Sequence, residues 1–212
     1  MKGARRLCVP EMPKVESEAI IQKINFYCRI RELELINNKN GDDMEVLIIV
    51  GSKSDLTEME GAVQVLKKFD ASFEIHISSA HRSLKRTIGL IESAEKNGAK
   101  VIIAAAGMSA HLPGVVAALT VIPVIGVPLN SSALNGLDSL LSIVQMPSGI
   151  PVATTAIGKS GATNAALLAV SILAVNNAGL TEKLKKYRKE MEESVTLADN
   201  ELNSKSARPR PL

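Results

Sequence analysis

The chain has 212 residues, of which 46% are hydrophobic but 2% aromatic. It is long enough for one substantial core, which has to be built from Ala, Val, Ile and Leu, the residues that fill parallel sheets and their covering helices. The formal net charge is +3, and the sequence has no basic stripe with interleaved aromatic residues. Composition therefore argues against a nucleic-acid-binding surface and favours an α/β fold.

Neither metal binding nor a membrane anchor is expected from the sequence. Cys8 and Cys28 both precede the predicted core, and neither belongs to a Cys-x-x-Cys motif or has a histidine nearby. No apolar run reaches the about 20 residues of a membrane span, and the first residues lack the hydrophobic stretch of a secretory signal. We therefore expect a cytoplasmic protein.

The first 44 residues differ in composition from the rest of the chain. They are rich in charge, and apolar residues recur at helical spacing between residues 15 and 36, before Asn-Asn-Lys-Asn-Gly at 37–41 ends the pattern. This N-terminal extension, residues 1–44, is interpreted as one helix or as disordered. Since Met44 stands directly before the first predicted strand, the extension is either genuine or an overlong gene model.

From residue 45 onward, short β-branched runs alternate with longer amphipathic stretches, which is typical of right-handed βαβ units around a parallel sheet. The predicted strands are 46–50, 73–78, 100–105, 124–127 and 152–155. The predicted helices between and after them are 56–69, 84–97, 111–119, 138–145 and 161–177. This order predicts a three-layer αβα sandwich with a flavodoxin-like, five-stranded parallel sheet.

A last helix is predicted near residues 180–198, within a main domain of residues 45–200. Its apolar stripe has to be covered by the domain itself or by a neighbouring subunit. The stripe consists of Leu180, Leu184, Tyr187, Met191 and Val195. Residues 201–212 are predicted to be a disordered tail.

The loop after the first strand, residues 51–55, reads Gly-Ser-Lys-Ser-Asp. Its glycine permits a tight turn, and its hydroxyls together with the amides of a helix start can hold an oxyanion. The loop is neither a Walker A nor a GxGxxG motif. Asp55 has two interpretations of equal weight, an N-cap reinforced by Glu58 or a carboxylate that accepts hydrogen bonds from sugar hydroxyls.

The loop after the second strand contains Ser79, Ala80, His81 and Arg82. His81 lies past the strand end, where an imidazole can reach a bound ligand, and Arg82 is suited to a phosphate. Because loop histidines more often serve as structural hydrogen-bond partners, His81 is not decisive by itself. His76 falls within the alternation of the strand and is interpreted as a packed or half-exposed strand residue.

The loop after the third strand, residues 106–114, combines small residues with His111. Small residues such as Gly107 allow the backbone to approach a ligand closely, and the loop amides can hold a developing negative charge. Tight helix packing explains the same residues equally well, so the residues alone leave both interpretations open.

Taken in order, the three loops resemble the N5-carboxyaminoimidazole ribonucleotide mutase family of purine biosynthesis, and the resemblance covers roughly residues 45–198. It rests on Gly-Ser-Lys-Ser-Asp at 51–55, Ser-Ala-His-Arg at 79–82, Gly-Met-Ser-Ala-His-Leu-Pro-Gly at 107–114 and the stretch from 123 to 147. No single loop is decisive, but the ordered set is highly specific.

The resemblance implies conversion of N5-carboxyaminoimidazole ribonucleotide to 4-carboxy-5-aminoimidazole ribonucleotide without metal, ATP or an organic cofactor. It also implies a homo-octamer with active sites at subunit contacts, and functional coupling to the ATP-dependent synthetase that makes the carbamate. Carried over by position, His81 transfers the proton, His111 belongs to the site wall, and the ribonucleotide is bound by Ser52, Asp55 and Arg82. The implied lining also includes Ser54, Ser79, Ala80 and Gly107.

At two places the sequence departs from the family's usual pattern. Thr-Pro usually follows the His-Arg pair where this chain has Ser83 and Leu84, and a second glycine followed by alanine stands where this chain has Met108 and Ser109. A loop with methionine is bulkier and stiffer than one with glycine, so closure over substrate is expected to differ. A related animal-type branch carries Lys after the catalytic histidine, where Arg82 matches the bacterial-type mutase.

The implied chemistry needs one group that first gives and later takes a proton, and an imidazole does both near neutral pH. We therefore expect His81 to be the general acid and base. Two alternatives remain, direct carboxylation of aminoimidazole ribonucleotide with carbon dioxide, and a non-catalytic nucleotide-binding flavodoxin-like module. The second is weakened because no aromatic residue lies in the three loops to stack on a flavin.

Overall fold

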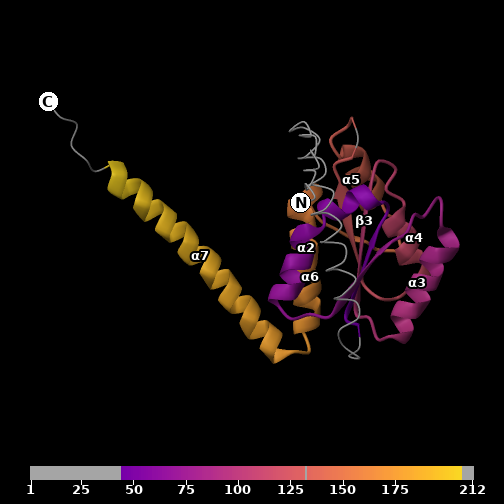
Figure 1. Ribbon diagram of the computed structural model, residues 1–212, viewed down its shortest axis with the longest axis horizontal. Helices are drawn as coiled ribbons and strands as arrows, with labels where there is room; N and C mark the ends of the chain where they lie inside the picture. The colour runs from indigo at the N-terminus through magenta and orange to yellow at the C-terminus, as the bar shows by residue number, and fades with distance from the viewer. Residues whose placement is uncertain (1–43, 132, 207–212) are drawn as a thin grey trace, which may run out of the picture. The chain divides into compact units, whose positions relative to one another are not determined.

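The computed structural model describes residues 44–131 and 133–206. The predicted N-terminal helix and both cysteines lie outside these residues. In the described part, one parallel sheet is covered by helices on both faces (Figure 1).

The sheet contains β1 (Val46–Val50), β2 (Phe73–Ile77), β3 (Val101–Gly107), β4 (Val124–Leu129) and β5 (Ala153–Thr154). The strand order is β2-β1-β3-β4-β5, and every neighbouring pair is parallel. Each predicted strand is confirmed with its ends within two residues. The predicted three-layer, flavodoxin-like α/β fold is therefore confirmed.

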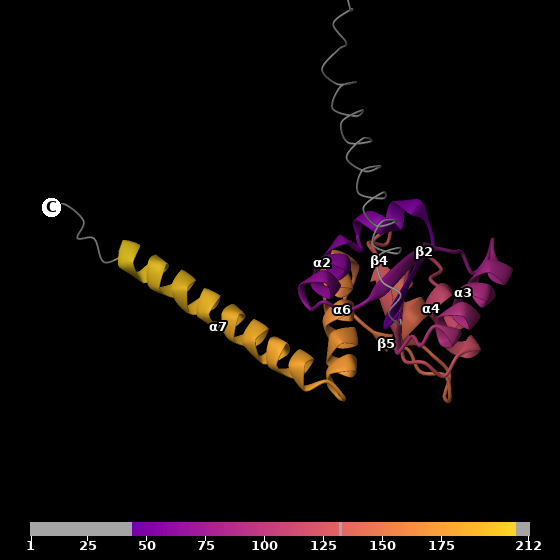
Figure 2. The same cartoon turned by 60° about the horizontal axis from the view of Figure 1, so that its bottom comes forward.

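Two sets of helices cover the sheet, one on each face (Figures 1 and 2). One face carries α2 (Glu60–Lys68) and α6 (Gly158–Ala174). The other carries α3 (Leu84–Lys96), α4 (Leu112–Leu119) and α5 (Leu137–Val144). The predicted helix 56–69 divides in two, because a 3-10 helix, η1 (Lys53–Thr57), precedes α2.

Alternate residues of the strands build the core. On the α3–α5 side, side chains of β1 and β3 pack with one face of each covering helix, and each fully buried Ile or Leu contributes about 2 kcal/mol. This cluster includes Leu47, Ile49, Ile91, Ile102, Ala104, Val116 and Ile143. Along β3 the residues change from Val and Ile to Ala towards the carboxyl end, which leaves room beyond that end of the strand.

The two edges of the sheet differ in length and charge. β5 has two residues, whereas β2 has five and carries a pair of polar side chains. His76 Nε2 lies 2.8 Å from Glu74 Oε2, and both side chains are partly exposed. His76 is therefore a partly exposed strand residue, as the sequence indicated.

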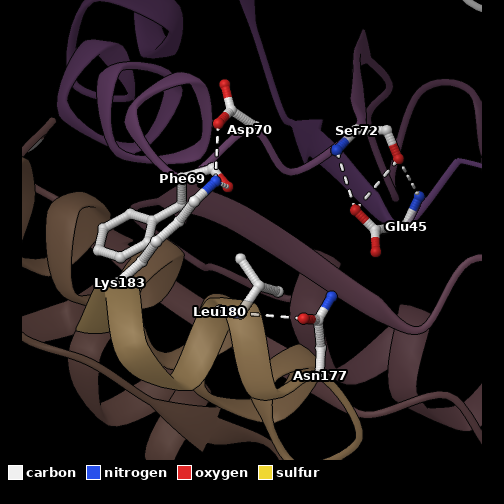
Figure 3. A network of polar contacts seen from close by, with 7 residues as sticks. All are labelled: Glu45, Phe69, Asp70, Ser72, Asn177, Leu180 and Lys183. Carbon is white, nitrogen blue, oxygen red and sulfur yellow. Dashed lines mark hydrogen bonds and ion pairs between the residues drawn. The ribbon is translucent and has the colours of Figure 1, made fainter. Parts of the chain in front are cut away.

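The first turns of α7 (Ala178–Ser206) are fastened to the end of α2 (Figure 3). Asn177 Oδ1 accepts a hydrogen bond from the Leu180 N–H at 3.1 Å and so caps the helix. Lys183 Nζ donates to Asp70 Oδ2 at 2.7 Å and to the Phe69 carbonyl oxygen at 3.5 Å. The residues that connect α2 to β2 thus hold the start of α7 in place.

The predicted apolar stripe of α7 is covered only at its beginning. Leu180 is 7% exposed, and Tyr187 meets the Phe69 ring edge-on with 5.6 Å between centroids. Met191 and Val195 are 46% and 71% exposed. Contact with the domain therefore ends near the middle of the helix.

The C-terminal helix is longer than the sequence predicted, because it continues to Ser206. Residues 201–206 are helical where a disordered tail was expected, and local bonds such as Asn203 Nδ2 to Asp199 Oδ2 at 3.2 Å support these turns. Residues 207–212 lie outside the described part. Among the described helices, none combines the length and apolarity needed to cross a bilayer.

Candidate active site

A cavity of about 290 Å³ lies beyond the carboxyl ends of four adjacent strands, β2, β1, β3 and β4. The direction of strand order reverses between β1 and β3, and open α/β sheets bind ligands at such a point. Eight of the nine predicted site residues line this cavity. They are Ser52, Ser54, Asp55, Ser79, Ala80, His81, Gly107 and His111.

The loop after β1 brings two hydroxyls and a carboxylate to the cavity. The Oγ atoms of Ser52 and Ser54 are hydrogen-bonded at 2.7 Å, and Ser54 Oγ donates to Asp55 Oδ1 at 3.4 Å. Asp55 is 8% exposed and is the third residue of η1, so it is not an N-cap. Of the two interpretations of Asp55, the structure favours the carboxylate of a ligand site.

The loop after β2 is a compact turn held by serine hydroxyls. Ser83 Oγ accepts from the Ser79 N–H at 2.9 Å and donates to the Ser79 carbonyl at 3.1 Å. Ser79 Oγ in turn accepts from the Arg82 N–H at 3.3 Å. Arg82 is exposed and does not line the cavity, so its predicted phosphate contact stays a prediction.

The two departures after the His-Arg pair are accommodated by this turn. Ser83 supplies the hydroxyl that a threonine would also supply, and that hydroxyl bonds back to Ser79. Leu84 is the first residue of α3, a position where proline is favoured but not required, and its side chain is 47% exposed. Neither change removes a described contact of the site.

The loops after β2 and β3 meet through their histidines. His81 Nε2 lies 2.7 Å from His111 Nδ1, and the rings are edge-on, with centroids 4.9 Å apart and 83° between planes. One of these nitrogens has to carry the bridging hydrogen, and the other accepts with its lone pair. The pair therefore holds a transferable proton between two rings that both border the cavity.

The loop after β3 is packed tightly against the loop after β4. A Cβ atom at Gly107 would collide with the Ser131 side chain, so glycine is required where the backbone passes this hydroxyl. Ala110 is 1% exposed and fixes the far side of the same loop in the core. His111 precedes α4 directly and is thereby held at a defined place.

Six residues of the lining were not predicted as site residues. Five of them lie in the first loop, the third loop or at the start of α4, which the sequence had already marked as a whole, namely Gly51, Ala106, Met108, Ser109 and Leu112. Ser131 follows β4 by two residues. Open α/β sheets bind ligands beyond the carboxyl ends of their strands, and applying this rule to the fourth strand as well as to the first three would have identified Ser131.

The arrangement favours acid–base chemistry on a polar ligand. Serine hydroxyls and one buried carboxylate can orient such a ligand, and the two imidazoles can move a proton. Within the described residues, His, Cys, Asp and Glu do not form a group of three or more that could hold a metal ion.

Residues 45–194 match the family model described as AIR carboxylase. The chain is 58% identical over 147 residues to N5-carboxyaminoimidazole ribonucleotide mutase of Pyrococcus abyssi, which covers 69% of this chain and 83% of that protein. The mutase of Escherichia coli K12 is 51% identical over 150 residues, or 71% and 89% of the two chains. The crystal structure of Treponema denticola PurE matches with a TM-score of 0.68 at 30% identity, over 74% of this chain and 97% of that one. The chain therefore belongs to the AIR carboxylase family, among relatives named N5-carboxyaminoimidazole ribonucleotide mutase, as its loops predicted.

Proposed function

We propose that this protein interconverts N5-carboxyaminoimidazole ribonucleotide and 4-carboxy-5-aminoimidazole ribonucleotide in de novo purine biosynthesis. Relatives more than 50% identical carry the name of this activity. The proposal rests mainly on one observation. His81 and His111 are hydrogen-bonded to each other in the lining of the cavity that the three predicted loops surround. This pair provides the cavity with a group that can carry the proton that the proposed reaction transfers.

The ribonucleotide is held through its sugar and its phosphate. Asp55 is buried at the cavity wall, and a carboxylate has room for more acceptor contacts than the one bond from Ser54, so we assign it to the ribose hydroxyls. Ser52 and the amides around η1 suit the phosphate, with Arg82 as the cationic partner. This arrangement leaves the imidazole base beside His81.

The reaction is an isomerisation in which one carbon–nitrogen bond breaks and one carbon–carbon bond forms. His81 protonates the carbamate nitrogen, and the N–C bond breaks to give aminoimidazole ribonucleotide and carbon dioxide. The ring carbon then attacks carbon dioxide, and the proton displaced from that carbon returns to His81. Atoms and charge balance without any further reactant.

His111 supports this exchange through its contact with His81. Because the two nitrogens share one hydrogen at 2.7 Å, His111 can fix the orientation of the His81 ring while the opposite nitrogen faces the ligand. We assign His111 to the wall of the site and to this orienting contact.

The test is an assay of purified protein with two substrates in parallel. The carbamate should be converted directly, whereas aminoimidazole ribonucleotide with bicarbonate should be used poorly. The reverse preference would identify a direct carboxylase of the same fold. Binding of the nucleotide without any turnover would instead identify a non-catalytic module.

We also propose that the protein acts as a homo-octamer in the cytoplasm, coupled to the synthetase that makes the carbamate. The octamer is supported by apolar side chains that a single chain leaves exposed. On α5, Leu137, Leu141 and Val144 are 52%, 48% and 49% exposed. Light scattering at micromolar concentration tests the assembly, and an active monomer would contradict it.

A further inference from the structure

Met108 has a backbone conformation that its residue type rarely adopts. Three described residues other than glycine have positive φ, namely Asp70, Met108 and Asn135, with φ of 56°, 54° and 53°. Aspartate and asparagine tolerate this left-handed region through local hydrogen bonds, whereas methionine gains nothing there. An outlier of this kind persists only where its surroundings impose it, and such residues cluster at functional sites.

The neighbours of Met108 impose its conformation from both sides. Before it, Gly107 is pressed against Ser131, and after it Ala110 is buried in the core. Between these points, the His111 N–H donates to the Ser109 carbonyl at 2.8 Å and closes a tight turn. Met108 therefore lies in a loop that is held by contacts on both sides of it.

The side chain of Met108 is unusual among those that border the cavity. It is 59% exposed, while Leu112, the other large apolar residue of the lining, is 2% exposed and belongs to the core. The rest of the lining consists of hydroxyls, small residues, Asp55 and the two histidines. Met108 is thus the large apolar side chain that the cavity presents to solvent.

We propose that Met108 caps the bound imidazole ring and retains carbon dioxide during the reaction, an inference that rests on the proposed function. A flexible thioether packs well on an aromatic face, and its apolar volume excludes water from the space beside it. Carbon dioxide released from the carbamate is uncharged and has to remain next to the ring carbon until the new bond forms. Met108 makes its escape slower by covering the open side of the cavity.

The experiment uses full-length protein and a carbamate labelled with ¹⁴C in its carboxyl group, in buffer that contains unlabelled bicarbonate. Label retained in the carboxylated product reports direct transfer, and label lost to the buffer reports escape. Three variants separate side chain from backbone. Met108→Leu keeps an apolar cap, Met108→Ala removes it but keeps the Cβ atom, and Met108→Gly removes both the cap and the backbone conflict.

Both the Ala and the Gly variants should lose label about fivefold more often per turnover than wild type, because closing a site suppresses side reactions of its intermediates. Met108→Leu should retain label as wild type does. Spontaneous loss is subtracted with His81→Asn protein, and circular dichroism verifies the fold of each variant.

Retention equal to wild type in the Ala variant would overturn the capping role while leaving the proposed function intact. An effect in the Gly variant alone would also overturn it, since the backbone and not the side chain would then be responsible. An inactive wild-type protein would instead reject the proposed function, and the capping role with it.

Discussion

The loops around the two histidines and the outer half of α7 differ in how far their side chains are held by contacts within the chain. The loops are held by bonds within the chain, from the serine turn at residues 79–83 to the contact between His81 and His111. The outer half of α7 presents Met191 and Val195 without cover from the domain. The difference separates two tasks, since bonds within one chain order its polar loops, whereas the apolar surface that the chain leaves exposed suits assembly.

The largest expected effect is a loss of turnover from a substitution in the site that leaves α7 unchanged. His81→Asn should lower turnover by about 10³-fold or more, since it removes the proposed general acid and base but keeps a polar side chain of similar reach. Ligand affinity, measured by calorimetry with the product ribonucleotide, should stay within about tenfold of wild type.

The oligomeric state of His81→Asn, followed by light scattering, serves as the control. It should not change, because His81 lies in the cavity lining and away from α7. Substantial residual turnover would show that His81 is not the general acid and base.

The second largest effect should come from a change in α7 that leaves the site intact, namely a stop codon after Glu190. This truncation keeps the Tyr187–Phe69 contact and the ion pair between Lys68 and Glu190 at 3.2 Å, but removes the exposed part of α7. Burying two or three such apolar side chains is worth a few kcal/mol, so the association constant should fall on the order of a hundredfold. Sedimentation velocity over a concentration series measures it.

A stop codon after Ser204 is the matched control for this truncation, because it leaves every residue of the apolar stripe in place. If both truncations assemble alike, the exposed half of α7 is not an interface. Turnover per chain should survive in either protein if the site is complete within one chain, and its loss would show that residues are shared between chains.

A smaller effect is expected for Arg82→Lys. The change replaces a planar, bidentate donor by a point charge, so affinity for the ribonucleotide should fall about tenfold with a smaller change in kcat. Steady-state kinetics gives both quantities. Since Arg82 is exposed and outside the described lining, an unaltered KM would indicate that its guanidinium faces away from the phosphate.

The smallest effect tests the inner half of α7. Tyr187→Ala removes the edge-on contact with Phe69 and the approach of Lys68 Nζ, 4.5 Å from the ring centroid. The free energy of unfolding should fall by about 1–2 kcal/mol, measured by urea denaturation. Lys185→Ala, in a highly exposed pair with Glu182, is the control and should cost little. Equal losses would mean that α7 is not anchored through Tyr187.

The sequence predicted the sheet well because its physics is local and repetitive. Buried parallel strands need continuous runs of Val, Ile and Leu, and such runs are present at 46–50 and 101–103. The three polar loops follow the carboxyl ends of neighbouring strands, so the strand order alone predicts that they lie together.

What the sequence did not predict depends on side-chain geometry or on weak local preferences. Thirty residues separate His81 from His111, and spacing alone cannot set a 2.7 Å contact between particular ring nitrogens. Asp55 fitted a capping pattern equally well, and its place inside η1 follows from the tight path of the chain after β1. The end of α7 was misplaced because polar residues such as Asn203 fit a disordered tail as well as an exposed helix.

The edges of the sheet bear on how copies of this protein can join. An open strand edge offers unpaired N–H and C=O groups to any extended chain, and so serves as a template for fibre growth. Here β2 places the Glu74–His76 pair on one edge, and β5 ends the other edge after two residues. Strand addition is disfavoured at both edges, so any contact between copies is expected to use helices and loops. Assembly of that kind stops when the apolar side chains are covered, whereas a sheet that recruits strands has no such limit.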